Sequence, residues 1–347
     1  MLLIKPQLVE NLGSVDGMRS AIQSAIELEH ATIPPYLYAL YSLGAGNAEI
    51  AERIHSVVVE EMAHFTLAAN LLNAIGGAPC IDKPQFIPTY PGPLPGTVEG
   101  GLDVTLERFS IEQTENCFMK IEEPEDPVAI KDDLTAAGQP LTIGMFYDRI
   151  RTHLEALEAS RQRKGDTIFT GDPAYQVVQD FPSWEVFPVL KLDDAKKAIS
   201  FIVFQGEGTP SSPSDPLAGG ELAHYYRFGE IVHGRALVSD GKVLPTWSYT
   251  GDPIPFDPST VAPVIANPKT AGYPAGSAAR YGCQTFNYTY TSLLKVLHEA
   301  FNGNPSRLSA AIGMMESLKE QALTLATIDS GDGGKAGPSF EYQPTNP

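Results

Sequence analysis

The chain has 347 residues, of which 43% are hydrophobic and 19% charged, a composition typical of a folded globular protein. Acidic residues (42) outnumber basic ones (24), and the net charge of −18 argues against nucleic acid or an anionic membrane as a partner. The cysteines Cys80, Cys117 and Cys283 are widely spaced and form no disulfide or zinc pattern. Because no secretory signal or long apolar span is visible, we expect a cytoplasmic protein.

Apolar residues recur in steps of four and three near the start of the chain and predict two long helices, over residues 15–43 and 47–75. Pro34 and Pro35 lie within the first helix and are expected to kink or interrupt it. The pair Gly76 and Gly77 predicts the end of the second helix.

The rest of the chain alternates between helical and irregular patterns. Residues 161–190 have no clear pattern, and residues 241–286, rich in Pro, Gly, Thr and Ser, are expected to wind over the surface. Residues 287–301 and 305–327 predict a helical hairpin. Further helices are predicted over residues 105–122, 141–160, 193–205 and 221–234.

Two Glu-x-x-His motifs, Glu61–His64 and Glu221–His224, lie in predicted helices. Residues three apart on a helix share a face, so each motif can direct a carboxylate and an imidazole at one point. In carboxylate-bridged two-metal bundles, two such helices act together with one glutamate from each of two others.

Two further glutamates complete this pattern. Glu29 lies on the apolar stripe of the first helix, where a carboxylate is rarely buried without a partner. Glu207 ends a later helix between glycines that permit a close approach. Glu60 falls off the apolar stripe, so we expect it to be solvated. Glu221 has an alternative interpretation, as an acid that the helix dipole favours at an N-terminus.

The predicted metal ligands are therefore Glu29, Glu61, His64, Glu207, Glu221 and His224. Their order along the chain predicts an all-α, ferritin-like four-helix bundle with additional helices, long Pro/Gly-rich loops and a C-terminal helical hairpin. We expect residues 1–240 to form the metal-binding bundle and residues 241–347 to form the loop and hairpin packed on it. Carboxylates mixed with imidazoles suit iron or manganese.

Several segments resemble the ferritin-like domain of iminophenyl-pyruvate dimer synthases, which are similar to violacein- and indolocarbazole-pathway proteins. The segments are AIELEHATIPPYLYALYSL (25–43), VVVEEMAHFTLAANLLNAIGG (57–77), YPGPLPG (90–96), IVFQGEGT (202–209) and ELAHYYRF (221–228). The resemblance implies the metal positions Glu29, Glu61, His64, Glu207 and His224. Relatives often have an acid where this chain has Met145. If that acid ligates metal in relatives, the resemblance implies an altered site here that holds one metal ion or none instead of two.

The function stays open among three classes. The resemblance implies a non-haem dinuclear iron or manganese oxidative enzyme that uses O2 or peroxide on an aromatic amino-acid-derived imine or a related small intermediate. The second class is a manganese-catalase-like peroxide dismutase. The third is a metal-free or metal-storing ferritin-like protein, although long loops and the hairpin would obstruct assembly into a storage cage. Pairing into a homodimer also stays open, and no catalytic residue is predicted.

Overall fold

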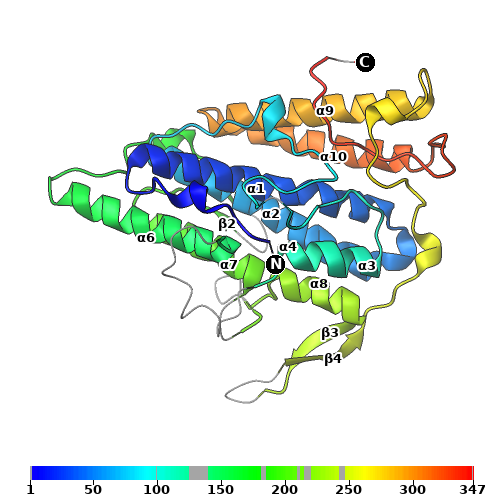
Figure 1. Cartoon of the computed structure of the whole chain (residues 1–347), viewed down its shortest axis with the longest axis horizontal. Helices are drawn as coiled ribbons and strands as arrows, with labels where there is room; N and C mark the ends of the chain where they lie inside the picture. Colours follow the sequence, from blue (N-terminus) through cyan, green and yellow to red (C-terminus); the bar gives the residue numbers. More distant parts are fainter. Residues whose placement is uncertain are drawn as a thin grey trace.

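The chain is mostly helical, and four helices form a bundle at its centre (Figure 1). α1 packs along α2, α6 packs along α7, and contacts between α1 and α6 and between α2 and α7 close the bundle. The bundle helices are α1 (Val15–Ser42), α2 (Ala48–Ala74), α6 (Ile143–Gln162) and α7 (Leu192–Glu207). The computed structural model describes residues 2–98, 100–124, 140–180, 185–208, 212–214, 220–241, 247–345 and 347.

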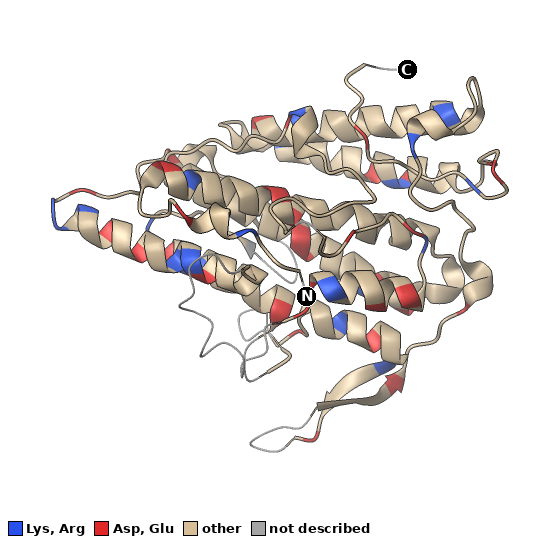
Figure 2. Cartoon of the chain, viewed as in Figure 1, with Lys and Arg blue, Asp and Glu red and all other residues tan. Residues whose placement is uncertain are grey.

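Other elements surround the bundle. The helical segment 111–121 and α8 pack together, and α8 contacts α2. α9 and α10 form a hairpin, in which α9 contacts α2 and α10 contacts α1. Lys and Arg positions are spread over several elements of the chain rather than gathered on one (Figure 2). The elements are α3 (Ile111–Gln113), a π-helix (Thr114–Phe118), α4 (Met119–Ile121), β1 (Gln179–Asp180), β2 (Glu185–Val186), α8 (His224–His233), β3 (Arg235–Ser239), β4 (Trp247–Pro253), α9 (Ala278–Phe301) and α10 (Leu308–Leu325).

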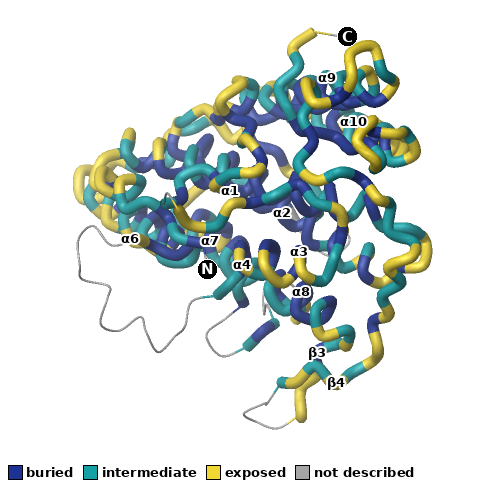
Figure 3. Tube along the Cα trace, turned by 45° about the vertical axis from the view of Figure 1, so that its right-hand side comes forward, coloured by how far each residue is buried: buried dark blue, intermediate teal, exposed yellow. Residues whose placement is uncertain are grey.

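The two central helices begin and end where the sequence predicts. The Ser14 hydroxyl accepts a hydrogen bond from the Gly17 amide and caps α1, and Gly76, with a φ of 71°, follows the end of α2. Most positions along both helices are buried (Figure 3). Among the described residues, no helix is both long and apolar enough to cross a bilayer.

The two prolines do not interrupt α1, which continues to Ser42. A proline at position 35 removes the backbone N–H that would bond to the carbonyl of Ala31. The hydroxyl of Tyr90 donates to that carbonyl instead, at 2.6 Å. A side chain from a distant loop therefore satisfies the carbonyl that the proline leaves unpaired.

Three predicted boundaries are wrong. The helix predicted from residue 105 begins at Ile111, because the Ser110 side chain accepts from the Gln113 amide and caps it there. The predicted surface segment 241–286 contains β4, which pairs antiparallel with β3, and also the first turns of α9; its residues 242–246 lie outside the described part of the chain.

The third boundary concerns the second Glu-x-x-His motif. The helix predicted from residue 221 begins only at His224. The preceding residues are extended, since Leu222 forms a β-bridge with Ser214 and the Ala223 amide donates to the Pro213 carbonyl. The domain division at residue 240 stays a prediction, and the β3–β4 pair joins residues from both of its sides.

Candidate metal centre

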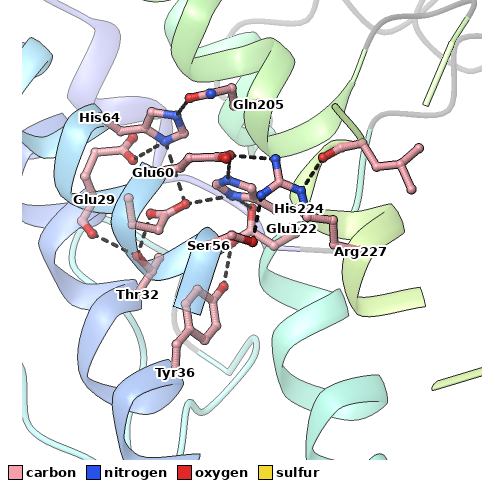
Figure 4. A network of polar contacts seen from close by, with 12 residues as sticks. Glu29, Thr32, Tyr36, Ser56, Glu60, His64, Glu122, Gln205, His224 and Arg227 are labelled. Atoms are coloured by element: carbon pink, nitrogen blue, oxygen red, sulfur yellow. Dashed lines mark hydrogen bonds and ion pairs between the residues drawn. The ribbon is translucent and has the colours of Figure 1, made fainter. Parts of the chain in front are cut away.

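Two buried groups of carboxylates and imidazoles lie next to each other in the bundle (Figure 4). The first group comprises Glu29 from α1 with Glu61 and His64 from α2. His64 Nδ1 lies 3.6 Å from Glu29 Oε2 and 3.7 Å from Glu61 Oε1. One potential ligand atom from each residue lies within 4.8 Å of the other two, so this group could hold a metal ion.

The second group shares Glu61 with the first and adds Glu122, which follows α4, and His224, the first residue of α8. His224 Nδ1 lies 2.9 Å from Glu61 Oε1 and 3.5 Å from Glu122 Oε2. The rings of His64 and His224 stack with their centroids 5.4 Å apart. Glu61 Oε1 therefore lies near Nδ1 of both imidazoles, and this carboxylate would be common to both groups if each held a metal ion.

Hydroxyl groups hold the three carboxylates in place. Tyr147 on α6 donates to Glu29, Tyr36 on α1 donates to Glu122 at 2.5 Å, and Thr32 donates to Glu61 Oε2 at 2.7 Å. Each of these bonds uses an oxygen that does not approach a histidine Nδ1. The oxygen atoms nearest the imidazoles stay directed into the centre.

The outer nitrogen of each histidine also has a partner. His64 Nε2 lies 2.7 Å from Gln205 Oε1, and His224 Nε2 lies 3.0 Å from Glu60 Oε2. Since these partners are acceptors, each Nε2 carries the proton when the ring is neutral, and the Nδ1 lone pair then faces the carboxylates. His224 Nδ1 is buried and faces two carboxylates, with Glu61 Oε1 at 2.9 Å and Glu122 Oε2 at 3.5 Å. A positive charge at this point, either a metal ion or a proton on Nδ1, would satisfy both the imidazole nitrogen and the carboxylates.

The pKa values also reflect a demand for positive charge. Burial raises the pKa of the Glu29 and Glu122 carboxyls, because a charge is poorly solvated inside the protein. Burial opposes the protonation of His64, but hydrogen bonds and charges from Glu29 and Glu61 outweigh it and raise its pKa to about 10. For Glu61, burial is outweighed by both imidazoles, and its pKa falls well below the usual range. Without metal, protons supply the charge that these carboxylates attract.

A small cavity adjoins both groups and adds a fourth carboxylate, Glu207, at the end of α7. The backbone amide of Gly144 donates to Glu207 Oε1 at 3.0 Å, and a Cβ at position 144 would lie only 2.9 Å from Oε2. Two divalent cations would balance the charge of these four carboxylates. The buried carboxylate and imidazole donors, and the negative charge that the carboxylates carry, fit metal ions.

The six predicted ligands do not all lie together in the structure. It brings together Glu29, Glu61, His64 and His224, and it places Glu207 on the adjoining cavity. The predicted role of Glu221 does not fit this geometry. Its side chain is 46% exposed, lies 3.6 Å from an Arg227 nitrogen and belongs to neither buried group.

Two buried glutamates differ from the sequence predictions, since Glu122 was not predicted as a ligand and Glu60 was expected to be solvated. Glu122 lies at the end of the predicted helix 105–122, next to apolar Ile121. A carboxylate at the apolar end of a helix is the sequence feature that could have indicated a buried ligand. Glu60, expected to be solvated, is 2% exposed, because α8 covers a second face of α2. Met145 does not line the cavity, and Glu122 supplies a carboxylate from a different element.

Comparisons with known proteins identify the fold. Residues 22–233 match a family model described as ferritin-like. The fold is similar to the crystal structure of a ferritin-like protein from Caulobacter vibrioides, with a TM-score of 0.63 and 23% identity over 94% of this chain and 97% of that one. None of the curated proteins matches the chain.

Proposed function

The chain belongs to the ferritin-like family, and we propose that it is a non-haem oxidative enzyme whose centre holds two ions of iron or manganese. The observation that carries the proposal is the position of Glu61 between the two buried groups. Two separate metal sites would each need their own ligands, whereas a shared carboxylate is the mark of a dinuclear centre.

The described side chains divide into roles around such a centre. Glu29 and His64 would hold one ion, Glu122 and His224 the other, with Glu61 between them and Glu207 on the cavity side. When bound, the two ions supply the redox chemistry that O2 or peroxide requires.

The surrounding residues then prepare the site. The hydroxyls of Tyr147 and Tyr36 orient the outer carboxylates, so that little reorganisation is needed when the metal charge changes. The aliphatic side chains of Leu28, Ile202 and Val203 line the cavity and limit access of water to the carboxylates.

For the substrate, we propose the class implied by the sequence resemblance, an aromatic amino-acid imine or a related small intermediate. The decisive experiment has two stages. Elemental analysis of protein produced with iron and manganese supplements should find about two ions per chain. The loaded protein should then consume O2 or peroxide in the presence of a freshly generated aromatic imine. A protein that stays free of metal in both media would disprove the proposal.

A specific feature of the cavity favours peroxide dismutation as the second candidate. Among the described residues that line the cavity there is no Lys or Arg to pair with the carboxylate of an amino-acid-derived substrate. Hydrogen peroxide is small and uncharged and needs no such partner. Release of O2 from peroxide by the manganese-loaded protein, without an organic substrate, would favour this function over imine oxidation.

A further inference from the structure

The two halves of the centre differ in what supports their histidines. Behind His64 lies the neutral amide of Gln205, whereas behind His224 lies the carboxylate of Glu60. Both supporting side chains are almost completely buried. A hydrogen bond to a carboxylate is stronger than one to an amide oxygen and raises the basicity of the imidazole more.

Arg227 fixes the Glu60 carboxylate in this position. The Glu60 Oε2 atom accepts from Arg227 at 2.8 Å and faces His224 Nε2. The guanidinium is itself held by the hydroxyl of Ser56, at 3.0 Å, and by the backbone carbonyl of Leu222. Because each of the three guanidinium nitrogens has a hydrogen-bond partner, Arg227 is fixed in place and leaves Glu60 few alternative conformations.

The same contacts explain the place of Glu221. Its carboxylate lies 3.6 Å from Arg227 Nη2, the nitrogen that also donates to Glu60, so a chain of contacts runs from Glu221 through Arg227 and Glu60 to His224. Nothing equivalent supports His64, whose described outer partner is Gln205 alone. The two halves therefore share the bridging Glu61 but differ in how strongly their imidazoles donate to a cation.

We propose that Glu60, held by Arg227, is a positioning residue that makes the His224 half the tighter of the two metal positions. This inference rests on the proposed two-metal function. Loss of a carboxylate that orients a ligating histidine typically weakens metal binding about 10- to 100-fold. The two ions should consequently bind in two resolved steps.

The test is a titration of the metal-free full chain with Co2+, followed by visible absorption and calorimetry. Wild-type protein should bind two ions with separate affinities, with His224→Gln removing the tighter step and His64→Gln the weaker one. In Glu60→Gln the tighter step should weaken about 10- to 100-fold while the weaker step stays in place. Glu52→Gln, on an exposed turn of the same helix, is the matched control and should change neither step.

A second variant tests the inference independently if Glu60→Gln does not fold. Gln205→Glu leaves the Glu60–Arg227 pair intact and places a carboxylate behind His64, so the weaker step should tighten. Equal shifts of both steps in Glu60→Gln, or an unmoved weaker step in a folded Gln205→Glu, would overturn the inference while the two-metal function stands. Two ions that bind wild-type protein with equal affinity would also overturn it. Failure of the wild-type protein to bind any ion would overturn both proposals.

Discussion

The two Glu-x-x-His motifs have the same spacing, but only one of them places both of its residues in the centre. In the first, Glu61 and His64 lie within α2 and both enter the centre. In the second, α8 begins at His224, so the histidine enters while Glu221 stays outside in an extended segment. A separation of three residues defines a common face only where the helix is continuous. The missing carboxylate comes instead from Glu122 on another element.

The largest expected effect tests the stronger motif. The double substitution Glu61→Ala and His64→Ala removes the shared carboxylate and one imidazole, so both ions should be lost. Elemental analysis measures the loss, and circular dichroism should show the helices largely intact because the apolar stripe of α2 is unchanged. Glu52→Ala, exposed on the same helix, should keep both ions. Unchanged metal stoichiometry in the double variant would show that the centre lies elsewhere.

The next substitution tests the exchange of Glu221 for Glu122. Glu122→Gln should reduce the metal content from about two ions per chain to about one, because the second group loses a charged ligand. Glu221→Gln should leave the content near two, since its side chain is half exposed and belongs to neither buried group. Metal content per folded chain measures both variants. The opposite pattern would restore the prediction made from spacing.

A smaller effect is expected from the glycine beside Glu207. Gly144→Ala would place a Cβ 2.9 Å from the Glu207 carboxylate and force it to move. Metal affinity, measured by calorimetry, should fall about 10-fold, at the low end of the range for a disturbed site. The control is Gly313→Ala in α10, where a Cβ would meet nothing within 4 Å and should instead stabilise the helix. Equal metal affinity in the two variants would remove Glu207 from the centre.

The last prediction separates the centre from the C-terminal hairpin. The side-chain amide of Asn287 on α9 donates from Nδ2 to the Ser339 hydroxyl at 2.8 Å. Its side-chain oxygen Oδ1 accepts from the backbone amide of Glu341 at 3.0 Å. Asn287→Ala should lower the free energy of unfolding by about 1–3 kcal/mol because it leaves buried partners unsatisfied. Urea unfolding measures this change, and metal content should stay constant. A loss of metal would indicate that the hairpin supports the centre directly.

Most helices were predictable because their signals are local. The apolar periodicity of α1 and α2, the N-terminal cap at Ser14 and the glycine after α2 act within one or two turns. The failures are equally specific. A polar stretch hid the first turns of α9, and the Ser110 cap shortened the helix that precedes Glu122. These errors moved boundaries without changing the helical character of the chain.

The sequence by itself determined the helical bundle and four of the residues in the two buried groups, Glu29, Glu61, His64 and His224. Glu29, Glu61 and His64 follow from the apolar periodicity of α1 and α2. His224 follows from the second Glu-x-x-His motif, of which only the histidine enters the centre. Only the tertiary structure showed that Glu122, and not Glu221, lies in the second buried group. It also showed that Glu60 is buried behind His224. The physical reason is that helical spacing specifies a face, whereas the partner of that face depends on which distant elements pack against it.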